Sequence, residues 1–243
     1  MRKLRMLFTL LMVSVCSWQG VWAQGEHEPH EPQLVTVDVS YSEAGSLGYE
    51  VLASLAQQGL DKSVAIVEKL KIMGNSPMNE DDWAILKNFS VLKILDLSGA
   101  NITEIPQGQF SRSSLEEVTL PSTLETIWNS VFSSSYNLKS INLPSSLISI
   151  GTGAFSGCEN LTTIGDDGWP ASVTKIPSDC FANCINLRGF TIPEGITVIG
   201  SQAFWNCDYF SSSLPSSLQF QMFLLHYSFS LMMWYLIILK CFY

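Results

Sequence analysis

The chain has 243 residues, of which 47% are hydrophobic, and this is enough for one sizeable domain with a cap. Its 22 acidic residues outnumber its 13 Lys and Arg residues, so the formal net charge is -9 at pH 7. A chain this acidic repels phosphate backbones, and we therefore exclude nucleic acid from the expected partners.

Residues 1–23 have the pattern of a secretory signal peptide. Three basic residues precede an apolar stretch at residues 7–15, and residues 21–23 form a cleavage site that ends in Ala. We therefore expect an exported protein, located at the cell surface or outside the cell. Residues 24–33 contain Glu, His and Pro but no apolar residue, which predicts a flexible linker.

Residues 34–91 are expected to form an N-terminal cap of mixed α and β structure. Residues 35–39 alternate between apolar and polar types, as in a strand, and apolar residues recur at helical spacing over residues 47–55. Residues 70–74 predict a second strand. Asn79 is a favourable N-cap for a helix whose first turn carries three carboxylates.

From residue 92 to residue 218 the chain repeats itself about five times, at a period of 23 residues. The clearest copy contains Leu138, Ile141, Leu143, Pro144, Leu147, Ile150, Gly151, Ala154, Phe155 and Cys158. Pro144 ends a strand because it has no amide hydrogen, and Gly151 is expected to permit a turn. Each copy is too small to bury its own apolar face, so the copies must stack as a solenoid, which the cap covers at its first unit.

Four cysteines occupy two positions of the repeat. Cys158, Cys184 and Cys207 each lie three residues after a Phe, and Cys180 directly precedes Phe181. Equivalent positions stack in a solenoid, which favours a ladder of unpaired thiols in the core. Export also permits a disulfide, and the spacing alone gives no connectivity, so the disulfide state stays open.

The repeats lack the residues that a catalytic site needs. The three histidines lie at positions 27, 30 and 226, outside the repeats, so no Ser–His or Cys–His pair can form on the rigid part. Glu116 and Glu117 are adjacent on a strand and point to opposite faces. We therefore expect a protein that is not an enzyme and has no cofactor and no metal site.

The outward face of the strands is the candidate ligand-binding surface, because its side chains are small and mostly neutral. The candidates are Asp96, Glu117, Thr119, Ser140, Asn142, Thr163 and Thr191. Trp128 and Trp205 stand where other copies have small residues. This predicts partial exposure, with a role either as anchors for a partner or in packing between turns.

The repeat pattern stops after Leu218, and residues 219–243 are almost wholly apolar. As a helix, residues 223–239 would extend for about 26 Å, slightly less than the roughly 30 Å hydrocarbon layer of a bilayer. Two interpretations stay open. The segment at residues 220–243 is either a membrane anchor or an out-of-frame or truncated end.

The pattern Leu-x-x-Ile-x-Leu-Pro-x-x-Leu-x-x-Ile-Gly-x-x-Ala-Phe-x-x-Cys resembles that of the BspA-like leucine-rich repeat surface proteins of the Bacteroidetes type. The segment at residues 95–102 is similar to their first repeat, and the resemblance covers about residues 70–218. It implies an α/β repeat fold, a leucine-rich-repeat solenoid of short parallel strands with an N-terminal α+β cap.

The same resemblance implies a function in binding. Members of this family are typically exported, and some are implicated in adhesion to host proteins or to other cells. The expected function is a non-catalytic module for protein binding or adhesion at the cell surface. The alternatives are a component that captures glycans and a truncated fragment with no independent function.

Overall fold

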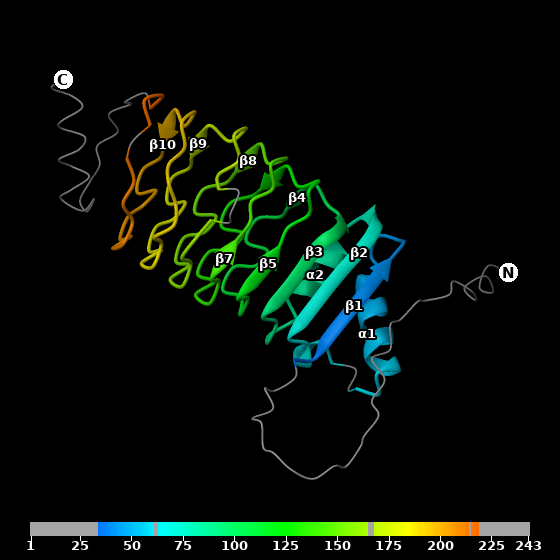
Figure 1. Cartoon of the computed structure of the whole chain (residues 1–243). Coiled ribbons are helices and arrows are strands. Elements are labelled where there is room, and N and C mark those ends of the chain that lie inside the picture. Colours follow the sequence, from blue (N-terminus) through cyan, green and yellow to red (C-terminus); the bar gives the residue numbers. More distant parts are fainter. Residues whose placement is uncertain (1–33, 61–62, 165–167, 214, 219–243) are drawn as a thin grey trace, which may run out of the picture. The chain divides into compact units, whose positions relative to one another are not determined.

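The structure is a computed structural model that describes residues 34–60, 63–164, 168–213 and 215–218 (Figure 1). The expected signal peptide, linker and apolar tail, including the possible membrane anchor, lie outside these residues. Within the described part of the chain, no helix is both long enough and apolar enough to cross a membrane.

The cap contains the strands and helices that the sequence predicts. They are β1 (Thr36–Tyr41), α1 (Leu47–Gln57), a 3-10 turn (Val64–Ile66), β2 (Lys69–Pro77) and α2 (Glu80–Leu86). In β1 every second side chain is buried, and buried apolar residues of α1 cover that inner face. Both helices lie on the same side of the sheet (Figure 1), so its other side is left uncovered by helices.

Asp82 fixes the two helices of the cap to each other. The Asn79 side chain accepts hydrogen bonds from the amides of Asp81 and Asp82, and the Asp82 carboxylate accepts one from the Asn79 amide, which completes a capping box. The same buried carboxylate accepts hydrogen bonds from the amides of Gly45 and Leu47 at the start of α1. The predicted N-cap is therefore present.

The repeats continue the cap sheet and add a second one. The first sheet has the order β1–β2–β3–β5–β7, all parallel, and includes β3 (Ile94–Asn101), β5 (Glu117–Thr119) and β7 (Ser140–Ile141). The second contains β4 (Glu104–Ile105), β6 (Thr126–Ile127) and β8 (Ser149–Ile150). Strands β9 (Lys175–Ile176) and β10 (Val198–Ile199) pair separately. The chain thus forms a parallel-strand solenoid of about five turns, as predicted.

A stack of phenylalanine rings fills the core opposite the first sheet. Phe110, Phe132, Phe155, Phe181 and Phe204 follow one another with ring centroids 5.5 to 5.6 Å apart and nearly parallel planes. Trp83 of α2 meets Phe110 edge to face at 6.4 Å. The cap therefore covers the exposed end of the stack, which is the role that the sequence assigned to it.

The turns around these rings require left-handed backbone at two positions per copy. In the clearest copy these are Gly153 and Gly157, and in the preceding copy they are Ser130 and Ser134, all with φ between 56° and 75°. Gly151 does not have a positive φ. A side chain there would come within 2.5 Å of the Asn129 amide, so this glycine is required by the close approach of the neighbouring turn and not by turn conformation.

Candidate functional site

The uncovered side of the first sheet, which we call the open sheet face, carries two rows of side chains in register. The residues of the first row are Thr36, Lys69, Ile94, Glu117 and Ser140, and those of the second are Asp38, Lys71, Asp96 and Thr119. Residues between them, such as Leu95, Val118 and Ile141, are buried. This alternation places the predicted outward residues of β3, β5 and β7 on the open sheet face.

Four predicted residues line one shallow hollow above β5 and β7. Glu117, Thr119, Ser140 and Asn142 are all exposed, and they surround a space of about 150 Å³ to which Val118 and Ile141 also contribute. Among the described residues, none of these four side chains makes a hydrogen bond or an ion pair within the protein. Their polar groups are therefore available to a ligand.

The other three predicted strand residues lie around this hollow with different surroundings. Asp96 is half-buried, accepts a hydrogen bond from the Ser98 amide at 2.9 Å and lies 3.6 Å from the Lys71 ammonium. Partial burial raises the pKa of Asp96, but its hydrogen bonds with Ser98 and the charge of Lys71 outweigh this and lower the pKa overall. Thr163 is exposed and joins Ser140 through one isolated bridge, and Thr191 is exposed but lies outside the strands.

The two predicted tryptophans are partly exposed but do not belong to the open sheet face. Trp128 follows β6 of the second sheet, is 48% exposed and donates a hydrogen bond from Nε1 to Oε2 of Glu104 at 2.9 Å. Trp205 lies in the turn after Phe204 and is 37% exposed. The structure thus separates Trp128, on the second sheet, from the residues that line the hollow.

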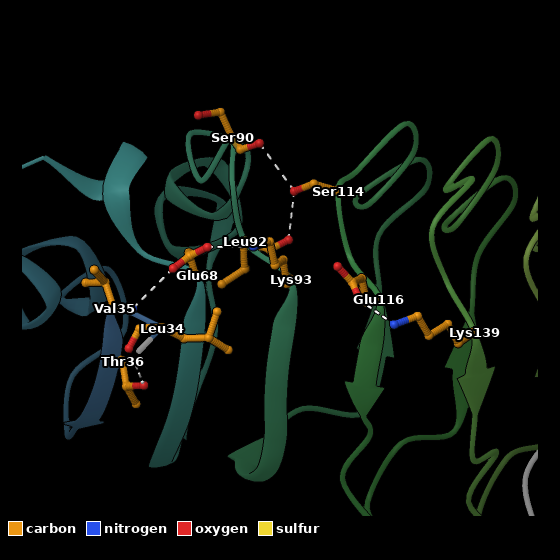
Figure 2. A network of polar contacts seen from close by, with 10 residues as sticks. All are labelled: Leu34, Val35, Thr36, Glu68, Ser90, Leu92, Lys93, Ser114, Glu116 and Lys139. Atoms are coloured by element: carbon orange, nitrogen blue, oxygen red, sulfur yellow. Dashed lines mark hydrogen bonds and ion pairs between the residues drawn. The ribbon is translucent and has the colours of Figure 1, made fainter. Parts of the chain in front are cut away.

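Sequence reasoning missed a series of alternating charges that borders the open sheet face (Figure 2). Glu68, Lys93, Glu116 and Lys139 each directly precede a strand, β2, β3, β5 and β7 in turn. The Lys93 ammonium lies 2.6 Å from Glu68, and the Lys139 ammonium lies 2.6 Å from Glu116. The hydrogen bond from Lys93 lowers the pKa of Glu68. In turn, the hydrogen bond to Glu68 raises the pKa of Lys93, and the hydrogen bond to Glu116 raises the pKa of Lys139. In the first three copies the second residue reads Lys93, Glu116 and Lys139, and this alternation of charge was the signal that could have revealed the pairing of Lys139 with Glu116.

The cap residues of the open sheet face were also missed. Asp38, Lys69 and Lys71 extend the two rows onto β1 and β2. The similarity of residues 70–74 to the strand portion of a repeat indicated a strand here, but it aligns Leu70 with Leu92, whereas the structure pairs Leu70 with Leu95.

The cysteine ladder is made of unpaired thiols, which confirms the favoured interpretation. Cys158, Cys180 and Cys184 are buried, Cys207 is partly buried, and all four are free. Each of the three equivalent thiols donates a hydrogen bond to the carbonyl of a Phe in the preceding copy, at 3.0 to 3.2 Å. Ser135, at the same position one copy earlier, donates to the Phe110 carbonyl at 2.7 Å.

Burial keeps these thiols protonated. It raises the pKa of Cys158 and of Cys207 to about 12, and it raises the pKa of Cys180 and of Cys184 well above the ordinary value. Neutral buried thiols are poor nucleophiles and poor metal ligands. In the described ranges, no group of three or more His, Cys, Asp or Glu residues could hold a metal ion.

The comparisons with known proteins agree with this architecture. The model of the BspA type leucine rich repeat region matches residues 103–230 with six copies. The structure of a leucine rich repeat protein from T. pallidum is similar at 19% identity and a TM-score of 0.50, with 76% of this chain and 80% of that chain covered. This likeness shows the fold.

Two further solved structures are more distant. A leucine-rich repeat protein from Bacteroides ovatus is 20% identical with a TM-score of 0.40, covering 63% of this chain and 46% of its own. A leucine rich cell surface protein from Faecalibacterium prausnitzii is 18% identical with a TM-score of 0.27, covering 82% of this chain and 81% of its own. A search of curated proteins gives no match. Since the family model covers more than half of the chain, this protein belongs to the family of BspA type leucine rich repeat proteins.

Proposed function

We propose that this chain is an exported, non-catalytic module for protein binding or adhesion at the cell surface, and that the open sheet face is its binding surface. BspA type leucine rich repeats are in general protein-interaction modules. The observation that carries the proposal for this chain is the hollow lined by Glu117, Thr119, Ser140 and Asn142, whose polar side chains have no partner within the described residues.

Several polar side chains at other positions of the repeats are paired with the neighbouring turn. Ser114 donates a hydrogen bond to the Leu92 carbonyl at 2.7 Å, Thr123 donates to the Ile102 carbonyl at 2.8 Å, and Ser135 donates to the Phe110 carbonyl. The side chains of the hollow are exposed instead, so their polar groups can form hydrogen bonds with groups of a partner. The expected partner is a protein of the host or of a bacterial surface.

The test is to capture surface proteins of host and bacterial cells on the immobilised whole chain. A variant with Glu117→Arg, Asn142→Arg and Thr163→Arg should lose the captured proteins. A control with Glu125→Arg, Ser149→Arg and Thr174→Arg introduces arginines at exposed positions away from the open sheet face and should keep them. Both variants are first checked by circular dichroism. Capture that survives in the first variant, or that disappears in both, contradicts the proposed surface.

A second candidate function is the capture of glycans, and the observation that favours it is Trp128. Its indole is 48% exposed and is held in place by the hydrogen bond to Glu104, so it offers a fixed apolar ring face beside a polar group. Under this alternative, saturable binding to polysaccharides should be lost on Trp128→Ala and on Trp205→Ala but kept on Asn142→Arg. A polysaccharide panel with no bound member excludes it.

A further inference from the structure

The hollow on the open sheet face contains a carboxylate that has no ion pair with any described lysine or arginine. Glu117 is exposed on β5, and the lysines on either side of it along the sheet, Lys139 and Lys71, are bonded to other carboxylates. The Lys139 ammonium lies 2.6 Å from Glu116, and the Lys71 ammonium lies 3.6 Å from Asp96. Glu117 attracts Lys139 only through space, which contributes to the raised pKa of Lys139. The charge of Glu117 is therefore free to pair with a group of a partner.

The groups around Glu117 suit a cation that donates several hydrogen bonds. The hydroxyls of Thr119 and Ser140 and the amide oxygen of Asn142 line the same hollow and can all accept hydrogen bonds. A guanidinium has five N–H donors in one plane and pairs with a carboxylate through two parallel hydrogen bonds. A planar group of this kind fits a shallow hollow on a sheet better than a compact ammonium does.

The lining of the hollow places the cation between β5 and β7, because Glu117 and Thr119 belong to β5 while Ser140 and Asn142 lie on and directly after β7. Lys69 is in the same row as Glu117 but two strands away, with Ile94 between them, which corresponds to about 10 Å. Lys69 would repel a cation that moved toward β2. The formal charge of the chain, -9, adds a long-range attraction for basic partners.

We propose that the hollow formed by Glu117, Thr119, Ser140 and Asn142 is an anchor site for an arginine side chain of the protein partner. This inference rests on the proposed function and specifies the chemistry of the partner. The arginine pairs with the Glu117 carboxylate and donates its remaining hydrogen bonds to the side chains around it. Replacing the guanidinium with a neutral group of the same shape removes the charge pair and keeps the fit.

The test is a titration of the ¹⁵N-labelled whole chain, followed by NMR, with two blocked peptides, acetyl-Gly-Arg-Gly-amide and its citrulline analogue. The arginine peptide should shift the amide signals of Thr119, Ser140 and Asn142 in a saturable manner. The citrulline peptide should bind at least about tenfold more weakly, because it retains the shape but lacks the charge. Glu117→Gln should weaken binding of the arginine peptide to the same extent. Glu125→Gln, which removes an exposed carboxylate elsewhere, should leave it unchanged.

Three results overturn the arginine anchor. These are equal binding of the two peptides, undiminished binding to the Glu117→Gln variant, and the absence of saturable shifts in the hollow. The capture assay separates this failure from failure of the proposed function. If the triple arginine variant loses the captured proteins while Glu117→Gln keeps them, the anchor is wrong and the binding surface stands. If both variants keep them, the surface itself is wrong.

Discussion

Two walls of the same solenoid differ in how their side chains are paired. In the wall of phenylalanine rings, which we call the Phe wall, each ring packs on the equivalent ring of the next turn. Three cysteines of the ladder, Cys158, Cys184 and Cys207, each donate a hydrogen bond to a carbonyl of the preceding copy. On the open sheet face the strands pair through their backbones, but the four side chains that line the hollow have no hydrogen-bond or ion-pair partner among residues 34–60, 63–164, 168–213 and 215–218.

The difference is reflected in the sequence of the copies. Positions of the Phe wall repeat the same residue type because each must pack against its own equivalent. On the open sheet face, by contrast, equivalent positions read Asp96, Thr119 and Asn142. A repeated residue in this protein therefore marks internal packing, and a position that varies from copy to copy marks a surface free to serve binding.

The comparison predicts its largest effect in the Phe wall. Phe155 is fully buried between Phe132 and Phe181, so Phe155→Ala removes two ring contacts and leaves a cavity. We expect the free energy of unfolding to fall by about 3 to 5 kcal/mol, measured by urea denaturation. A loss below about 1 kcal/mol would mean that the rings are not packed as a stack.

A second prediction concerns the pH dependence that the buried thiols give to the Phe wall. The pKa of Cys158 is about 12 in the folded protein and near its ordinary value of 9.0 when unfolded. Between these two pH values the thiol ionises only in the unfolded chain, which favours unfolding. The contribution of the buried, neutral thiol to the free energy of unfolding is therefore complete below pH 9.0 and is lost as the pH rises toward 12, by about 1.4 kcal/mol per pH unit.

Cys158→Ser tests this directly, because Ser135 shows that a hydroxyl at this position makes the same hydrogen bond. The serine does not titrate, so between about pH 9 and 11 the variant should lose stability less steeply than the unchanged chain, by about that amount. The other titrating groups are common to both proteins and cancel in the comparison. Identical slopes would show that the thiol is accessible to solvent.

The smallest effect on stability is expected on the open sheet face. Asn142 is exposed, and its side chain makes no hydrogen bond within the part of the chain that the structure describes, so Asn142→Ala should change the free energy of unfolding by less than about 0.5 kcal/mol. Urea denaturation of Asn142→Ala and of Phe155→Ala under the same conditions compares the loss in free energy of unfolding at the open sheet face with the loss at the Phe wall. A large loss for Asn142→Ala would show that the open sheet face has a structural role.

Much of the fold was predictable because the repeat constrains it. The 23-residue period predicted that the copies stack, and the spacing of Ile141 and its equivalents predicted which side chains of each strand are buried. Asn79 indicated the start of α2. The role of Gly151 was predicted wrongly, since close contact between turns depends on how tightly neighbouring copies approach, and a single copy does not contain that information.

The candidate site was only partly predictable for a related reason. Alternation along a strand identified Glu117, Thr119, Ser140 and Asn142 as outward residues, and the structure adds that they share one hollow. The sequence of one copy does not show which lysines already have an ion-pair partner, because that partner lies in a neighbouring copy, as Glu116 does for Lys139. Trp128 could be expected to be exposed, but its place on the second sheet depends on how the chain divides each copy between two sheets.

The most direct test of the binding surface is photo-crosslinking to the captured partner. The whole chain is made with benzoylphenylalanine at position 142, on the open sheet face, or at position 125, which is exposed directly before β6. We predict that the partner crosslinks from position 142 and not from position 125. A partner that crosslinks from position 125 and not from position 142 contradicts the assignment of binding to the open sheet face.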